Sequence, residues 1–452
     1  MNKTRTKDMT EGPILGKIVP FAVPIFIGSV FQMLYNMVDS IIVGKYVGAN
    51  ALAAVGATGT VSMVLIGIAS GFTTGASVVV AQFMGAGRQH RIKAAISTTI
   101  IILVIASVLI TGLGEALSSS IMRWVNVPEE IFADSLLYFR IFMLGMLFLV
   151  MYNFFASFLR AMGDSTTPLV FLIIASLLNI AGDLFFVVKL NMSVAGVAIA
   201  TVLAQGVSVL LCMIYTSHKL EFFSFKRGEF IFDNTLFSSI VRLGIPSGLQ
   251  SSITGFGMVM VQSLINSYGP VCIAAYTAAS KMEGLCNLPM GSIAMAFSIF
   301  VGQNIGKGDL KRASKGLLYS ELLAVGISVV LSVAIYALGP QIMGLFIKAE
   351  ETEVIVIGAA FMRRWAPFIF LHALFEGFVS FLRGSGDSIF SMISMFFDLI
   401  TRTLMAYVFA KGLGMGFMGI AWAIPCGWLA CSVFSMLRYL QGGWKTKAVT
   451  DR

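Results

Sequence analysis

The feature that most constrains this chain is a succession of twelve apolar runs, each of twenty or more residues, separated by short polar loops. A bilayer core needs roughly 20 consecutive apolar residues in an α-helix, so each run is long enough to cross it. The longer runs suit helices that tilt or project beyond the lipid. We predict twelve transmembrane helices near 15–43, 53–82, 94–117, 132–159, 166–188, 194–217, 236–266, 273–303, 313–338, 355–382, 388–410 and 417–440.

The charge content agrees with a membrane protein. Only 12% of the 452 residues are charged, whereas about a quarter are charged in an average soluble chain. This excludes a water-soluble enzyme or nucleic-acid-binding protein, although the net charge is +9. Of the 31 Lys and Arg residues, 21 fall on the side that holds both chain ends and eight on the other side. The positive-inside rule therefore predicts a multi-pass protein of the cytoplasmic membrane with both termini in the cytoplasm.

The sequence is an internal duplication. The turn Gln82-x-x-Gly85-x-Gly87-x-x-x-Arg91 recurs 221 residues later as Gln303-x-x-Gly306-x-Gly308-x-x-x-Arg312. The segment Phe158-Leu159-Arg160-x-x-Gly163-Asp164-Ser165 recurs 223 residues later as Phe381-Leu382-Arg383-x-x-Gly386-Asp387-Ser388. Each half holds six helices, an even number, so the two repeats enter the membrane in the same direction.

We therefore predict an all-α polytopic fold of two parallel six-helix repeats around a central cavity. Its expected parts are an N-terminal cytoplasmic tail (1–14), an N-lobe (15–217), a cytoplasmic linker (218–235), a C-lobe (236–441) and a C-terminal cytoplasmic tail (442–452).

Several motifs resemble the multidrug and toxic compound extrusion (MATE) family of cation-coupled efflux transporters, over about 15–440. They are the run 32–39 (QMLYNMVD) with 43–48 (VGKYVG), the repeated turn at 82–87, LRAMGD at 159–164 and NIAGD at 179–183. The resemblance implies two lobes that form a V-shaped cavity. It also implies export of amphipathic, often cationic compounds against entering Na⁺ or H⁺.

Polar residues within the spans need partners or a function, because ionisable groups are costly there. The first predicted helix carries Tyr35 and Asp39, the fifth carries Asn179 and Asp183, and the sixth carries Thr201. At 1.5 Å per residue, the last four of these lie within roughly 6–15 Å of the outer surface. Such oxygen-bearing groups can ligate Na⁺, and two close carboxylates can share a proton.

The resemblance matches all five of these residues to the N-lobe coupling site of the family's DinF-like branch. We therefore predict a cation- or proton-coupling site here, in which Asp39, Asn179, Asp183 and Thr201 hold the metal ion if the protein is sodium-coupled. The alternative is a hydrogen-bonded cluster that only fixes the three helices.

The C-lobe does not repeat this cluster, since Arg402 and Ala406 take the places of Asn179 and Asp183. We predict a structural ion pair between Asp398 and Arg402, which are four residues apart on one helix. Glu376 then lacks an obvious partner, and it either faces the cavity or is protonated. Lys281 and Glu283 either pair with each other or line the cavity.

Two further predictions concern motion and substrate. Pro24 lies inside the first helix, where proline removes a backbone hydrogen bond and permits a kink. The kink either responds to the charge of Asp39 or is static. The residues expected to line a substrate cavity are Met33, Asn153, Met258, Lys281, Glu283 and Glu376.

We interpret the chain as a secondary active antiporter that works by alternating access, with no enzymatic activity and no cofactor besides the coupling ion. Its expected partners are an amphipathic small-molecule substrate and membrane lipid, not nucleic acid, and we expect a monomer. One alternative is a lipid-linked oligosaccharide flippase of a related superfamily, which would favour a strongly cationic cavity. Another is a membrane receptor or scaffold that transports nothing.

Overall fold

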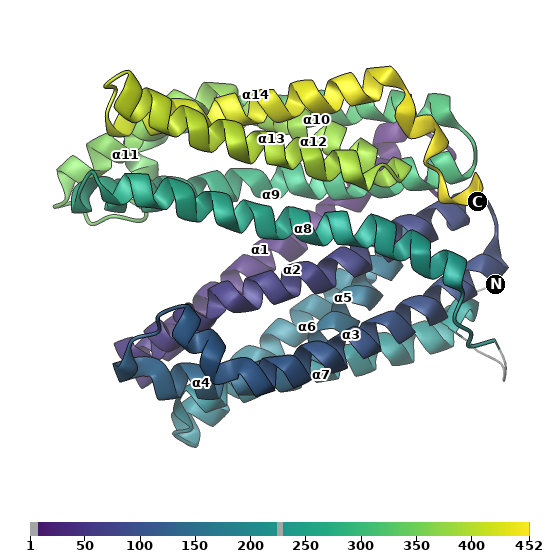
Figure 1. Ribbon diagram of the computed structural model, residues 1–452, viewed down its shortest axis with the longest axis horizontal. Helices are drawn as coiled ribbons and strands as arrows, with labels where there is room; N and C mark the ends of the chain where they lie inside the picture. Colours follow the sequence, from purple (N-terminus) through teal and green to yellow (C-terminus); the bar gives the residue numbers. More distant parts are fainter. Residues whose placement is uncertain (1–7, 224–228, 452) are drawn as a thin grey trace. The chain divides into compact units, whose positions relative to one another are not determined.

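The computed structural model describes residues 8–223 and 229–451. Residues 1–7 of the predicted N-terminal tail, 224–228 of the predicted linker and Arg452 lie outside the described residues. Over the part that is described, the regular structure is entirely helical (Figure 1). The prediction of an all-α polytopic fold is therefore confirmed.

Fourteen α-helices follow one another along the described chain. The first half contains α1 (Ile14–Ile42), α2 (Ala49–Gly85), α3 (Gln89–Trp124), α4 (Glu129–Leu144), α5 (Met146–Ala161), α6 (Thr166–Asp183) and α7 (Ser193–Lys219). The second half contains α8 (Asn234–Asn266), α9 (Pro270–Gly306), α10 (Leu310–Met343), α11 (Thr352–Trp365), α12 (Ile369–Ser385), α13 (Ser388–Tyr407) and α14 (Phe417–Gln441). Three π-helical turns extend α1, α6 and α13, namely η1 (Val43–Val47), η2 (Leu184–Lys189) and η5 (Val408–Gly412).

Each of the twelve predicted spans corresponds to helical structure. Ten helical segments among the described residues are long and apolar enough to cross a membrane, and the pair α4 and α5 makes an eleventh if it is one span. α8, in which some side chains are not described, corresponds to the remaining predicted span.

The predicted helix over 132–159 is not continuous, because α4 and α5 meet at Gly145 with a bend of 50°. A β-carbon at Gly145 would collide with Val202 of α7, so this glycine allows α7 to approach the break closely. The predicted helix over 355–382 is likewise divided into α11 and α12 by a 3₁₀ turn, η4 (Ala366–Phe368), which contains Pro367. Both breaks put irregular backbone inside a span, which is tolerated when neighbouring helices cover it.

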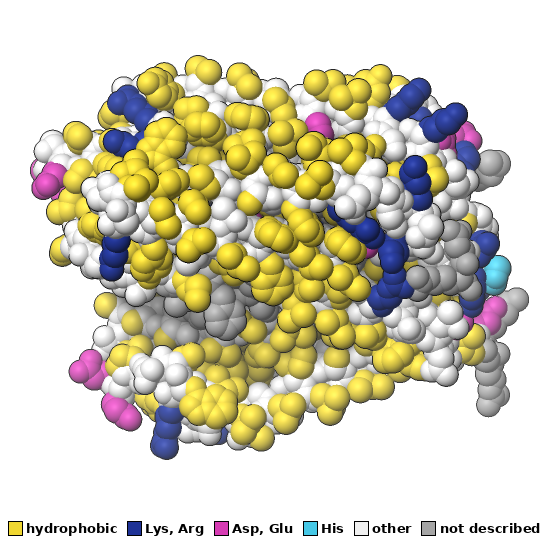
Figure 2. Space-filling view, turned by 45° about the horizontal axis from the view of Figure 1, so that its top comes forward, with side chains coloured by type: hydrophobic (Ala, Val, Ile, Leu, Met, Phe, Trp, Pro, Cys, Tyr) yellow, Lys and Arg dark blue, Asp and Glu magenta, His cyan; other side chains and the backbone are white. Residues whose placement is uncertain are grey.

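The outer surfaces of the helices are apolar. On the face drawn in Figure 2, hydrophobic side chains cover broad areas and most charged side chains lie toward the ends. α10 shows the pattern clearly, since it exposes Leu322, Val330 and Val333 by 62%, 68% and 63% while burying Glu321 and Ser328. A soluble protein rarely exposes such a stripe, whereas lipid accepts it.

The duplication is visible in the backbone. Gly87 and Gly308, which occupy the same place in the repeated turn, have φ of 67° and 84°. Gly163 and Gly386, in the second repeated motif, have φ of 88° and 91°. Because a left-handed conformation is strained for residues with a β-carbon, the repeated glycines are explained by the repeated turns.

The structure has two compact units, and two helices, α1 and α8, are divided between them. One unit contains Val23–Gly248, and the other contains Thr10–Ala22 together with Leu249–Arg452. The beginning of α1 therefore belongs with the C-terminal helices, and the beginning of α8 belongs with the N-terminal helices. The predicted lobe boundaries, 15–217 and 236–441, assigned each of these helices whole to one lobe.

Within the first unit, α2 and the start of α8 cross at glycines. A β-carbon on Gly75 would lie 2.7 Å from the Gly244 nitrogen and 2.7 Å from the Ile240 oxygen. A β-carbon on Gly71 would collide with the backbone of Gly248. Small residues spaced four apart let two helix backbones touch, which is a common way to pack helices in lipid.

We predict that Gly75→Ala destabilises the protein, because the two helices must separate to admit the methyl group. Overpacking of this kind costs about 1–3 kcal/mol, which exceeds the helix-propensity gain of about 1 kcal/mol from replacing glycine by alanine. Thermal unfolding in detergent measures the difference. The matched control is Gly59→Ala, also in α2, where a β-carbon meets nothing within 4 Å; an equal effect of the two changes would contradict the prediction.

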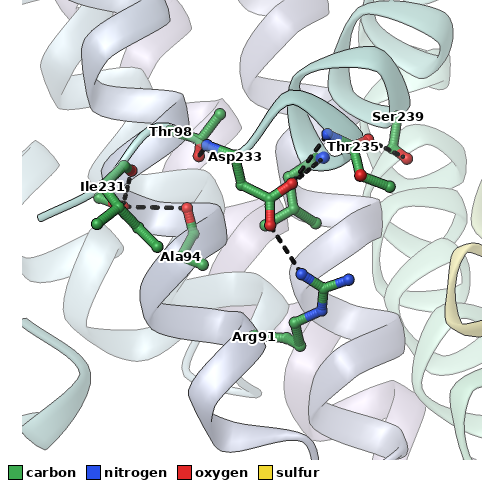
Figure 3. Close-up of polar contacts among 9 residues, drawn as sticks. Arg91, Ala94, Thr98, Ile231, Asp233, Thr235 and Ser239 are labelled. Carbon is green, nitrogen blue, oxygen red and sulfur yellow. Dashed lines mark hydrogen bonds and ion pairs between the residues drawn. The ribbon is translucent and has the colours of Figure 1, made fainter. Parts of the chain in front are cut away.

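A polar contact, which we call the N-side clasp, fixes the segment before α8 to the start of α3 (Figure 3). Arg91 Nη1 lies 2.7 Å from Asp233 Oδ2, and the Asp233 amide donates to the Thr98 hydroxyl at 3.0 Å. Ser97 donates its hydroxyl to the Ile231 oxygen at 2.7 Å. Asp233 also caps α8, since its Oδ1 accepts from the Thr235 amide at 2.9 Å.

A matching contact, the C-side clasp, fixes the segment before α1 to the corresponding turn of the second half. Lys307 Nζ lies 3.2 Å from Glu11 Oε1, and Arg312 Nη2 donates to the Gly12 oxygen at 2.8 Å. Arg312 is the repeat counterpart of Arg91. Each clasp lies within one compact unit and helps to hold the beginning of α1 or of α8 in that unit.

The two roles of Asp233 can be separated by substitution. Asp233→Asn keeps a good helix cap but removes the ion pair, so it should cost only a few tenths to about 1 kcal/mol, as partly exposed pairs do. Asp233→Ala removes both and should cost about 1 kcal/mol more. Hydrogen exchange at the first-turn amides of α8 reports the loss, and equal exchange in the two variants would show that the cap contributes nothing.

Candidate ion-coupling site in the N-terminal lobe

The five predicted coupling residues come from three helices of one compact unit. Asp39 and Tyr35 lie one turn apart on α1, Asn179 and Asp183 lie one turn apart on α6, and Thr201 lies in the third turn of α7. Residues four apart share a helix face, so each pair presents both side chains to the same side. α6 ends at Asp183, where the π-helical turn η2 begins.

Buried hydrogen bonds join α6 to α7. Asn179, Asp183 and Thr201 are only 2%, 0% and 8% exposed. With the Asn179 amide oriented to suit both neighbours, its nitrogen donates to Asp183 Oδ2 at 3.1 Å and its oxygen accepts from the Thr201 hydroxyl at 3.1 Å. Asn179 therefore acts as the bridge between the carboxyl group and α7.

The two acids face each other. The Asp39 and Asp183 carboxyl groups are within hydrogen-bonding reach, a contact that requires one of them to carry a proton, because two carboxylates offer no donor. One oxygen of each acid, Oδ1, is buried and has no hydrogen-bond partner among the described residues. The structure thus brings two acidic groups together, each with a buried oxygen that accepts from no donor among the described residues.

Two phenols complete the cluster. The Tyr35 hydroxyl is in hydrogen-bonding reach of Thr201 and close to both acids. Tyr138 of α4, which the sequence analysis did not select, lies close to Asp39, Asp183 and Tyr35. The sequence could have indicated Tyr138 by its depth, because this residue lies about two turns below the outer end of the predicted helix over 132–159.

An apolar cluster adjoins the acids. Val43, which follows the last turn of α1, packs with Ala51, Val187, Val194 and Val197 at 5% exposure or less, and Tyr138 packs against this cluster. The two acids therefore lie beside an apolar surface that excludes water. In such surroundings a carboxyl pair can hold a shared proton, and its free oxygens with those of Asn179 and Thr201 are ligands that suit Na⁺.

In the second unit, the predicted ion pair has a different partner. Arg402 Nη2 lies 3.1 Å from Glu283 Oε1 of α9 rather than at ion-pair distance from Asp398. Asp398 still interacts electrostatically with Arg402. The buried Oδ1 atom of Asp398, however, has no hydrogen-bond partner among the described residues. The prediction of an Asp398–Arg402 pair was wrong, because a residue brought in from another helix offers Arg402 a better-placed carboxylate.

Glu376 and Lys281 are also placed. Glu376 Oε1 lies 4.0 Å from His372 Nε2, one turn away on α12. Lys281 is exposed, and Glu283 pairs with Arg402 instead of with it. The structure therefore contradicts the alternative in which Lys281 and Glu283 pair with each other.

The remaining predicted residues are the proline of α1 and three residues of the expected substrate cavity. α1 continues without a break through Pro24. This proline lies close to the point, between Ala22 and Val23, at which α1 passes from one compact unit to the other. Met33 is 38% exposed, and Asn153 donates to the Leu149 oxygen of its own helix at 3.0 Å. Met258 has a side chain outside the described residues. A moving kink and a substrate cavity lined by these residues stay predictions.

Comparison with known proteins decides the family. The MatE family model matches residues 24–185 and 246–408, one match in each repeat. The chain belongs to the MATE family. The transporter is 29% identical to the Bacillus subtilis protein named "Probable multidrug resistance protein YpnP", over 98% of this chain and 99% of that one. It is 24% identical to the Thermotoga maritima protein named "Probable multidrug resistance protein NorM", over 96% and 94%.

Solved structures agree on the fold. A crystal structure titled as MATE in complex with MaL6 superposes with a TM-score of 0.90 at 25% identity, covering all of both chains. An outward-facing multidrug resistance MATE family transporter gives 0.89 at 24% identity, again over both whole chains. The transporter is thus a multi-pass membrane protein of a multidrug efflux family.

We predict that Thr201→Val lowers stability by about 1 kcal/mol, because it leaves the Asn179 oxygen without its hydroxyl donor in a buried site. The melting temperature in detergent measures this. Ser208→Ala is the control, since Ser208 lies on the same helix and its hydroxyl only donates to the Ala204 oxygen one turn back. If Thr201→Val is no more destabilising than Ser208→Ala, the α6–α7 bridge is unimportant.

Proposed function

We propose that this transporter exports amphipathic, often cationic compounds from the cytoplasm in exchange for entering H⁺ or Na⁺, and that Asp39 and Asp183 bind the entering ion. The observation that carries the proposal is the buried Asp39–Asp183 pair with an unpartnered oxygen on each acid. The names of the relatives, which refer to multidrug resistance, support export of drug-like molecules.

A structural role alone explains the cluster less well. The helices α1, α6 and α7 could be joined by neutral hydrogen bonds, as Asn179 and Thr201 already join α6 to α7. Two facing acids add repulsion whenever both are ionised, so their presence weakens the packing unless an ion offsets it. A site that alternately holds and releases a cation gives these acids a reason to be there.

The transport cycle follows from linkage. With the site open to the outside, the acids take up the ion, and the loaded state releases the exported compound. With the site open to the inside, the compound binds and the ion leaves to the cytoplasm. Because coupling is reciprocal, the ion and the compound must weaken each other's binding by the same factor, typically about 5–150-fold.

The experiment replaces Asp39 by asparagine and measures two quantities. In the unaltered transporter, acidification or added Na⁺ should raise the dissociation constant of an exported cationic dye by roughly 5–150-fold. In Asp39→Asn this ratio should approach one, and export from vesicles under an imposed Na⁺ or proton gradient should stop. Gradients applied singly distinguish the two ions.

The control is Glu130→Gln, an exposed acid in the first turn of α4, which should leave both quantities unchanged. Normal insertion and melting temperature of Asp39→Asn must accompany the loss. Undiminished ion-driven export by Asp39→Asn would refute the proposed coupling role, and vesicles without flux of any drug would favour a receptor or scaffold.

A further inference from the structure

A second acid lies buried in the other compact unit without a partner. Glu321 is on α10, on the face opposite the exposed stripe of Leu322, Val330 and Val333, and it is 8% exposed. Neither of its carboxyl oxygens has a hydrogen-bond partner among the described residues. A buried carboxylate without donors is strongly disfavoured, so this group must either be protonated or hold a cation.

The position of this acid is built by a glycine. A β-carbon at Gly377 of α12 would collide with Glu321 Oε1 and would lie 2.6 Å from Glu321 Cδ. The Glu321 carboxyl group therefore rests directly on the backbone of α12, in a space that only glycine leaves. We call this space the Gly377 notch. Glu376 directly precedes Gly377 on α12 and interacts electrostatically with Glu321.

The arginines on the surrounding helices have other partners, and Lys281 of α9 is exposed. Arg402 of α13 pairs with Glu283 of α9 at 3.1 Å. Arg383 of α12 donates to Gln250 at 3.2 Å, and the acid that it influences is Glu376.

The cations further away are also engaged. Those of α11 bond to carbonyl oxygens, Arg363 to Tyr336 at 2.9 Å and Arg364 to Ala360 at 2.7 Å. On α14, Arg438 pairs with Asp387 at 2.8 Å. His372 and Asp398 are the other titratable groups near Glu376.

The charges inside this unit therefore do not balance if every acid is ionised. Glu283, Glu321, Glu376 and Asp398 would carry four negative charges against two positive charges on Arg383 and Arg402. Charge in a membrane interior is costly and is normally paired. Glu321 is the most buried of the acids that lack an ion pair, so it is the group where a neutralising proton is most favourable.

We propose that Glu321, with Glu376, forms a second proton-binding site of the transporter, separate from the Asp39–Asp183 site. Glu321 holds the proton in the Gly377 notch as a carboxylic acid. Glu376, whose side chain is 25% exposed, accepts the proton as a carboxylate and passes it to water. On release, the Glu321 O–H bond breaks, Glu321 becomes a carboxylate, and the proton leaves as hydronium.

A proton suits this site better than a metal ion. Na⁺ needs several oxygen ligands, and the notch presents the backbone face of a glycine. The inference does not depend on the proposed coupling role of Asp39, since none of its residues belongs to that site.

Infrared difference spectroscopy tests the proposal, using the full-length transporter in lipid between acidic and alkaline buffers. The carbonyl stretch of a protonated carboxylic acid reports each acid directly. In a variant that combines Asp39→Asn with Asp183→Asn, we expect the acid band of Glu321, equivalent to one proton, to remain, separate from any band of Asp398, whose Oδ1 also has no partner among the described residues. Adding Glu321→Gln, which preserves shape, should remove the Glu321 band.

Two further variants make the result specific. Asp387→Asn removes a buried acid that is already paired with Arg438, so it should leave the band unchanged. Gly377→Ala fills the notch, so it should shift the frequency or the midpoint of the band.

Persistence of the band in the Glu321→Gln variant would overturn the proposal. Loss of the band on adding Na⁺ at constant pH would also overturn it, in favour of a metal-ion site. If instead Asp39→Asn retained ion-driven export while the Glu321 band behaved as expected, the proposed function would fail and this inference would stand.

Discussion

The structure depends on one constraint, which is that a polar group inside a lipid-spanning helix must find its partner within the protein. The constraint explains why α10 turns Glu321 inward and its valines outward, and why Asn179 bridges Asp183 and Thr201. It also gives meaning to the exceptions. Three acids with an oxygen unpartnered among the described residues, Asp39, Asp183 and Glu321, are the ones for which we propose that a cation or proton binds and is released.

The two halves use this principle differently, although they arose by duplication. The repeated turns kept their glycine conformations and their charged clasps. The polar interiors diverged, since Arg402 stands where the first half has Asn179. An arginine at that position draws in Glu283 and removes the chance of a second acid–amide cluster like the first. The frame is thus symmetric, while the chemistry within it is not.

The sequence predicted the fold well because span length and apolarity are local properties. It also predicted the N-lobe cluster, since depth along three helices can be counted from residue numbers. It failed where the partner came from elsewhere in space. Glu283 is 119 residues from Arg402, so the i,i+4 rule chose Asp398. Tyr138 was missed because a tyrosine near the end of a span is usually an interfacial residue. The bend at Gly145 depends on Val202 of α7, which no local pattern reveals.

The exchanged ends of α1 and α8 have a consequence for biosynthesis. The segment Thr10–Ala22 is translated long before its partners Lys307 and Arg312, which lie 296 and 300 residues further along the chain than Glu11 and Gly12. The beginning of α1 therefore cannot pack in its final place until the second repeat has been synthesised. Separately expressed halves would each lack a helix segment that the other one holds, so the ancestral duplication can no longer be divided cleanly at the linker.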